Sequence, residues 1–71
     1  MKMRIGLKDT TKFRVMLIEK GYSQRGFSKE IGTSGAYLNQ IINCRKHPSP
    51  KVARKIVEKL QLEFYDLFII Q

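Results

Sequence analysis

The chain has 71 residues, enough for one domain with a small core, because a chain of this length buries only about 60% of its unfolded surface. Its 14 lysine and arginine residues outnumber 6 acidic residues, which gives a net charge of +8 and a pI near 10.0. This balance attracts polyanions such as nucleic acid, anionic lipid or an acidic protein, although it also fits a charge that only maintains solubility. Little room remains for a deep pocket with a catalytic shell, so an enzyme is disfavoured.

Several other classes of protein are disfavoured by single residues and by short apolar runs. One cysteine, Cys44, excludes an intrachain disulfide and favours a cytoplasmic protein. His47 has no second ligand type at metal spacing, so we expect no metal site. The apolar runs Val15–Ile18 and Leu67–Ile70 are too short to cross a membrane, and no signal peptide is expected. Without a nucleophile–base or carboxylate pair, we expect no catalytic residue, cofactor or small-molecule ligand.

The chain is expected to divide into a basic N-terminal arm, residues 1–10, and a helical domain, residues 11–71. The arm carries Lys2, Arg4 and Lys8, which either lie on DNA or make no contact. Glycines and prolines divide the rest into five short helical segments. Because no long alternating pattern and no Asn-Gly or Asp-Gly hairpin occurs, the predicted fold class is all-α.

Three helices are predicted first, over residues 11–20, 24–31 and 35–43. Each follows a residue type that caps helices: Asp9 or Thr10, then Ser23, then Ser34. Gly21 and Gly32 follow the first two predicted helices, at the position where a helix commonly ends with a left-handed backbone that glycine adopts easily. Apolar residues at spacings of three and four are expected to face the core: Phe13, Met16, Leu17, Phe27, Ile31, Leu38, Ile41 and Ile42. Helices this short need tertiary packing to be stable.

A basic loop and two further helices complete the expected domain. The loop contains Arg45, Lys46, His47 and Pro48. The fourth helix is capped by Ser49 and runs from Pro50, where proline's missing N–H costs nothing, to Leu60. Its inward residues are Val52, Ala53, Ile56 and Leu60. The fifth helix is expected over residues 64–69, with Leu67 and Phe68 in the core.

The second and third helices have the lengths and spacing of a helix-turn-helix. Ser28 is small enough to let the two helices cross closely. The outer face of the third helix has no acidic side chain, and its amides, Asn39 and Gln40, can bond adenine in a bidentate manner. The N-termini of both helices offer N–H groups to phosphate. This pair of helices is therefore the predicted DNA-binding element.

A sequence pattern extends over most of the chain in one ungapped register. It consists of Ser23-Gln24, Phe27, Ser28, Ile31-Gly32, Tyr37-Leu38, Ile41, Pro48-Ser49, Lys55-Ile56, Leu60, Leu62 and Asp66-Leu67-Phe68. On these residues, the segment from Lys12 to Phe68 resembles the Cro/phage-repressor (Xre-type, lambda-repressor-like) helix-turn-helix family. The resemblance implies a compact five-helix, lambda-repressor-like DNA-binding domain.

The resemblance also implies roles for individual residues. Gln24 matches a glutamine that bonds phosphate and can brace a side chain of the recognition helix. Base-reading positions fall on Gly35, Ala36, Asn39 and Gln40, and phosphate contacts on Asn43, Arg45 and Lys46. With Arg25, Ser34 and Tyr37, these residues form the expected DNA-binding set. The chain departs from the family pattern where Ser28 replaces alanine and where Cys44 and Gln61 replace glycines.

Several of these residues have a second interpretation. Asn39 and Gln40 can be ordinary solvated residues, and Arg45 and Lys46 can be only a charged loop. The basic run on the fourth helix, which comprises Lys51, Arg54, Lys55 and Lys59, is interpreted as a solvated face. Cys44 is interpreted as a packed residue rather than a redox switch, and Tyr37 belongs either to the core edge or to the DNA contact.

The sequence thus predicts a sequence-specific double-stranded DNA-binding transcriptional regulator, a Cro-like or phage-type repressor that occupies an operator as a homodimer. The apolar C-terminal segment, residues 64–70, is the expected dimer interface, and packing of this segment on its own core is the alternative. A different function is a protein-interaction module, such as an antitoxin or a phage protein that binds a toxin or host partner.

Overall fold

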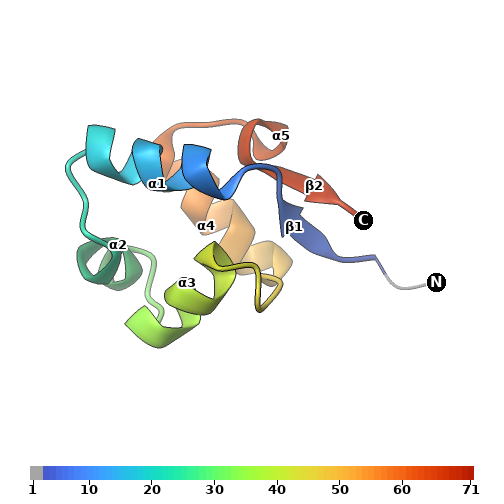
Figure 1. The fold of residues 1–71 in the computed structure, drawn as a ribbon, viewed down its shortest axis with the longest axis horizontal. Helices are drawn as coiled ribbons and strands as arrows, with labels where there is room; N and C mark the ends of the chain where they lie inside the picture. Colours follow the sequence, from blue (N-terminus) through green and yellow to red (C-terminus); the bar gives the residue numbers. More distant parts are fainter. Residues whose placement is uncertain (1–2) are drawn as a thin grey trace.

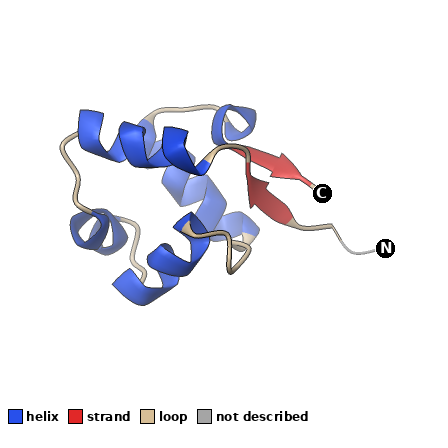
Figure 2. Ribbon diagram, in the orientation of Figure 1, coloured by secondary structure: helices blue, strands red, loops and turns tan. Residues whose placement is uncertain are grey.

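The structure is a computed structural model that describes residues 3–71, so Met1 and Lys2 of the predicted arm lie outside the described residues. Its elements follow one another along the chain as β1 (Ile5–Leu7), α1 (Thr10–Glu19), α2 (Gln24–Glu30), α3 (Gly35–Ile42), α4 (Pro50–Leu60), α5 (Phe64–Leu67) and β2 (Phe68–Ile70). The two strands lie side by side at one end of the molecule, and α2 lies at the other end (Figure 1). Helices account for most of the chain (Figure 2).

The helices begin at the capping residues that the sequence predicts. The side chain of Asp9 accepts from the backbone N–H of Lys12 at the start of α1. Serine hydroxyls accept in the same way at the next three helices, in Ser23, Ser34 and Ser49. Each bond satisfies a backbone donor that has no partner within its own helix. These four helices therefore begin at local sequence signals.

Four residues among those described have a left-handed backbone with positive φ. Gly21 (φ 81°) and Gly32 (φ 74°) end α1 and α2, as expected of glycine. Cys44 (φ 60°) and Gln61 (φ 58°) have the same backbone conformation after α3 and α4. Both stand where the family pattern has glycine, so the chain keeps the left-handed turn and accepts the strain of a side chain there.

The core lies where α1 to α5 and β2 meet. Phe13, Phe27 and Phe68 are fully buried, and the rings of Phe13 and Phe27 meet edge to face with centroids 6.2 Å apart. The predicted inward residues are buried or partly buried, whereas Val15 and Ile18 on α1 remain exposed. The apolar stripe of α1 therefore consists of Phe13, Met16 and Leu17.

The prediction of an all-α fold needs a correction, because β1 and β2 form a two-stranded antiparallel sheet. Ile5 pairs with Ile70, and Leu7 pairs with Phe68. The helix predicted over residues 64–69 ends at Leu67, and the chain continues as a strand. The β-branched Ile69 and Ile70 fit a strand well. The partner strand lies more than sixty residues away in the sequence, so no local hairpin pattern predicts the pairing. Residues 5–7, assigned to the arm, are thus part of the folded structure.

Candidate nucleic-acid interface

The α2–turn–α3 unit is held together by small residues and backbone hydrogen bonds. The backbone N–H of Thr33 donates to the Ser28 carbonyl at 2.9 Å, which fixes the turn after α2. Ser28 is 1% exposed, and its hydroxyl donates to the Arg25 carbonyl at 2.7 Å. A Cβ built on Gly35 would lie 3.9 Å from the Ser28 hydroxyl. A larger side chain at position 28 would therefore push α3 away from α2.

Helix α3 has one buried face and one solvent-facing face. Leu38, Ile41 and Ile42 are buried in the core. The predicted base-reading residues all lie exposed on the other face: Gly35, Ala36, Asn39 and Gln40. This face has no acidic residue and no side chain longer than glutamine, so phosphates and base edges can approach it closely.

The other predicted DNA-binding residues surround this face. Gln24 and Tyr37 are partly buried, whereas Arg25, Ser34, Asn43, Arg45 and Lys46 are exposed. The ammonium group of Lys46 lies 5.3 Å from the centroid of the Tyr37 ring, within the range of a cation–π contact. The backbone N–H of Arg45 donates to the Gln40 carbonyl at 2.8 Å, which ties the basic loop to the end of α3.

Four side chains form a continuous hydrogen-bonded chain across this surface: one each from α1, α2 and α3, and that of Asn43, which directly follows α3. The Asn39 amide nitrogen donates to the Gln24 side-chain oxygen at 3.3 Å. The Asn43 amide nitrogen donates to the side-chain oxygen of Asn39 at 3.2 Å and to its carbonyl at 2.9 Å. Arg14, on α1, donates to the Asn43 side-chain oxygen at 3.0 Å. Arg14 was not among the predicted residues, because only the fold brings α1 to the end of α3.

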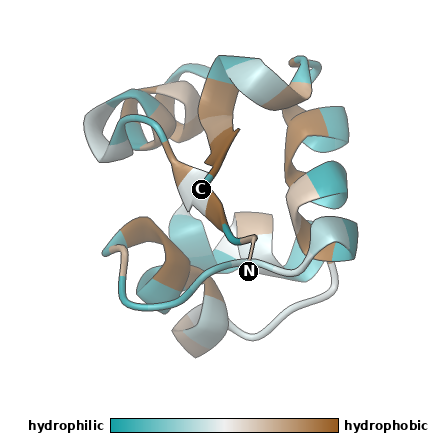
Figure 3. Cartoon of the chain, turned by 90° about the vertical axis from the view of Figure 1, so that its right-hand side faces the viewer, coloured by the Kyte–Doolittle hydropathy of each residue, from teal (hydrophilic) through white to brown (hydrophobic). Residues whose placement is uncertain are grey.

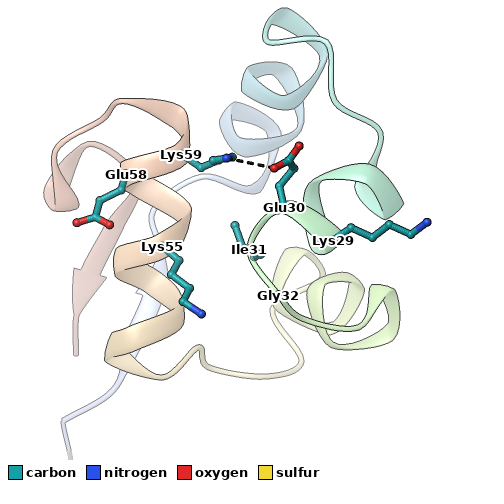
Figure 4. A pocket seen from close by; sticks show the side chains of 7 residues that line it. All are labelled: Lys29, Glu30, Ile31, Gly32, Lys55, Glu58 and Lys59. Atoms are coloured by element: carbon teal, nitrogen blue, oxygen red, sulfur yellow. Dashed lines mark ion pairs between the residues drawn. The ribbon is translucent and has the colours of Figure 1, made fainter.

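A second set of charged residues lies on another face, between the end of α2 and α4. Glu30 and Lys59 form an ion pair with a distance of 3.1 Å, and both line a hollow of about 410 Å³. Figure 4 marks this ion pair with a dashed line. Lys55 Nζ lies 3.8 Å from the point where a Cβ added to Gly32 would lie. This places the ammonium group near the carbonyl end of α2, where positive charge is favourable. These lysines are explained by the contact between the two helices, and no α3 residue lines the hollow.

Two further properties concern metal ions and membranes. Within residues 3–71, no group of three or more His, Cys, Asp or Glu side chains is arranged to hold a metal ion. None of the helices described is both long enough and apolar enough to cross a membrane. The candidate site is defined by what the structure does describe, the exposed polar face of α3 and the basic residues around it.

The geometry defines the class of domain. Two short helices joined by a sharp turn, with the second presenting a polar face to solvent, form a helix-turn-helix. In this motif the second helix lies in the major groove of DNA.

Comparison with known proteins agrees with this geometry. The model of the helix-turn-helix family matches residues 13–67. An uncharacterized HTH-type transcriptional regulator of Bacillus subtilis (strain 168), YvzC, is 33% identical over 52 residues, which cover 73% of this chain and 68% of YvzC. The chain belongs to the helix-turn-helix family of the Xre-type, lambda-repressor-like kind.

Proposed function

We propose that this protein is a sequence-specific double-stranded DNA-binding transcriptional regulator that inserts α3 into the major groove. The observation that carries the proposal is the exposed, acid-free face of α3, on which Gln24 braces Asn39 beside Gln40. A side-chain amide can donate to adenine N7 and accept from its N6 amino group, which specifies that base. Similarity to a protein named as an HTH-type transcriptional regulator supports the same function.

Most of the affinity would come from phosphates rather than from bases. The N-termini of α2 and α3 carry N–H groups with partial positive charge, although their caps already use one of these groups each. Arg25 stands at the start of α2, and Arg45 and Lys46 follow α3, so cations flank the base-reading face. Such contacts release counterions, and binding should therefore weaken steeply as the salt concentration rises.

Selection of binding sites from a random double-stranded DNA pool, at about physiological salt, tests this proposal. The wild type is expected to enrich a short site, whereas Asn39→Ala combined with Gln40→Ala is expected to lose or relax it. Gln61→Ala is the matched control, because it removes an exposed amide at the end of α4, outside the predicted DNA-binding set. Weak binding that has no preferred sequence and disappears with salt would contradict the proposal.

We further propose that the protein acts as a homodimer through its C-terminal segment, as a Cro-like or phage-type repressor that occupies an operator. Tyr65 is 60% exposed and Ile70 is 49% exposed. Figure 3 looks onto this end of the molecule and shows hydrophobic strand residues in brown near the C-terminus. A dimer would read two half-sites separated by about 34–36 Å, which raises affinity for a palindrome.

Sedimentation velocity with and without DNA tests the dimer. Ile70→Lys is expected to shift the protein toward monomer and to weaken binding to a palindrome more than to a half-site. Val15→Lys is the matched control, since Val15 is an apolar residue of α1 that is 45% exposed, close to the exposure of Ile70. A monomeric wild type at binding concentrations would contradict the dimer.

The exposed C-terminal residues also favour a second candidate function, a module that binds another protein, such as a toxin or a host factor. Exposed apolar residues clustered together mark binding surfaces. The DNA selection distinguishes the two functions. If the wild type recovers no site, binding of another protein through a surface that includes the exposed Tyr65 and Ile70 becomes the preferred function.

A further inference from the structure

The orientation of each amide in the chain from Arg14 to Gln24 follows from donor and acceptor chemistry. A guanidinium group only donates, so Asn43 must present its oxygen to Arg14. The Asn39 backbone carbonyl only accepts, so Asn43 must present its nitrogen to it. Both ends require the same orientation of the Asn43 amide, which is therefore fixed.

The fixed orientation of Asn43 determines the orientation of the next two amides. Because the Asn43 nitrogen faces Asn39, the Asn39 side chain presents its oxygen there and turns its nitrogen toward Gln24. The Gln24 oxygen accepts this bond. Among the residues that the structure describes, neither hydrogen on the Gln24 nitrogen has an acceptor, so both remain for an acceptor-only group such as phosphate.

The remaining hydrogen-bonding capacity of each side chain then indicates its role. Asn39 keeps one N–H and one oxygen lone pair, which is what bidentate recognition of adenine requires. Both N–H groups of Asn43 are used within the protein, and its oxygen accepts from Arg14. A phosphate oxygen needs a donor, and Asn43 has none left to offer.

We propose that Asn43 and Arg14 are positioning residues, which fix the direction in which the Asn39 amide faces DNA and thereby determine specificity for adenine. Asn43 is not a phosphate contact in this arrangement. The inference rests on the proposed function for the DNA-binding role of Asn39. It goes beyond that function by assigning specificity to two side chains that do not touch the base.

The first test uses the protein without DNA. The side-chain N–H signals of Asn39 in a nitrogen–proton NMR spectrum report its bond to Gln24, and those of Gln24 report the change at the oxygen that accepts this bond. Asn43→Leu, which keeps similar bulk and removes the amide, is expected to shift both signals. Arg14→Met, at an exposed position on α1, is expected to shift them in the same direction. If both variants fold and neither signal moves, the inference is wrong.

The second test separates specificity from affinity. The probes are the site recovered by the selection and variants that replace the adenine whose preference depends on Asn39. Asn43→Leu is expected to reduce the preference for adenine by about tenfold. Its binding to unrelated DNA and the salt dependence of that binding are expected to stay unchanged, because no phosphate contact is lost.

Arg14 is tested with a control of equal charge. Arg14→Met and Arg54→Met each remove one positive charge, and Arg54 lies on α4, where it pairs with Glu58. Both variants should bind all DNA somewhat more weakly, but only Arg14→Met should reduce the preference for adenine. Arg14→Lys should retain part of it, because an ammonium group is also a donor without an acceptor.

The outcomes distinguish the inference from the function on which it rests. If the wild type selects a site and Asn43→Leu weakens every sequence equally while keeping the preference for adenine, Asn43 is a phosphate contact and the inference alone is wrong. If the wild type selects no site, the proposed function and the inference both fail.

Discussion

The ammonium group of Lys46 lies over the ring of Tyr37, 5.3 Å from its centroid, so a basic residue of the loop is attached to the recognition helix. Tyr37 lies within α3, and Lys46 follows the left-handed turn at Cys44, so the contact joins the helix to the loop beyond this turn. Tyr37 is partly buried, and its ring provides a fixed surface for the flexible lysine stem. Lys46 is thereby held beside the face that carries Asn39.

We expect Lys46→Ala to weaken binding to all DNA sequences by a similar factor. A lysine that contacts phosphate contributes charge but no base preference, so the slope of log K against log salt should fall by about 1. Fluorescence anisotropy at several salt concentrations measures this slope. Lys51→Ala on α4 is the control, and an equal loss in both variants would show that only net charge matters.

We expect Gln61→Gly to stabilise the protein by about 0.5–1 kcal/mol. The left-handed backbone at Gln61 (φ 58°) is unfavourable for a residue with a Cβ, by about 1–2 kcal/mol, and glycine's greater freedom in the unfolded chain offsets part of the gain. Urea denaturation followed by circular dichroism measures the change. Lys20→Gly, at a helix end with right-handed φ of -86°, should destabilise instead. A loss of stability in both variants would contradict the strain at Gln61.

The size limit at Ser28 gives a further prediction. Ser28→Ala should change the free energy of unfolding by less than about 1 kcal/mol, because the hydroxyl bonds only to a helix carbonyl of its own turn. Ser28→Leu should cost about 1–3 kcal/mol or more, since Gly35 on α3 lies directly opposite. Thermal denaturation compares the two variants. Equal stability of both would mean that α2 and α3 do not need a close approach here.

The serine caps separate stability from binding. Ser49→Ala at α4 and Ser34→Ala at α3 should each reduce the free energy of unfolding by about 1 kcal/mol, because each leaves one backbone donor without its cap. Only Ser34→Ala should also weaken DNA binding at temperatures where both variants are fully folded, since Ser34 caps α3 and belongs to the predicted DNA-binding set, whereas Ser49 does not. Equal DNA affinity of the two variants would remove Ser34 from the predicted interface.

The sequence predicts the parts of this fold that have local causes. Ser23, Ser34 and Ser49 stand directly before their helices, and Phe13 and Leu17 are spaced to share one helix face, so these elements are visible along the chain. The helix-turn-helix follows from the same signals. Its assignment to a family is confirmed by the match over residues 13–67.

Features that depend on distant contacts are not visible in this way. The strand at residues 68–70 looks like the end of a helix until its partner at residues 5–7 is known. Arg14 looks like an ordinary solvated residue of α1 until the fold places it beside Asn43. The predicted roles of Asn39, Gln40 and the basic residues in binding DNA stay predictions, because their test requires DNA.

The pairing of residues 4–8 with residues 67–71 also affects how the chain is made. Arg4 and Gln71 exchange two backbone hydrogen bonds, at 3.0 and 2.7 Å. Arg4 can therefore form these two bonds only after Gln71 has been synthesised. During synthesis, the four longer helices can leave the ribosome and begin to pack by local contacts, which form quickly. The sheet closes only when Gln71 has emerged. A nascent chain stopped after Leu67 would therefore present its recognition helix while the N-terminal segment is held only by the Lys8–Leu67 and His47–Ile5 hydrogen bonds, without the pairing to β2.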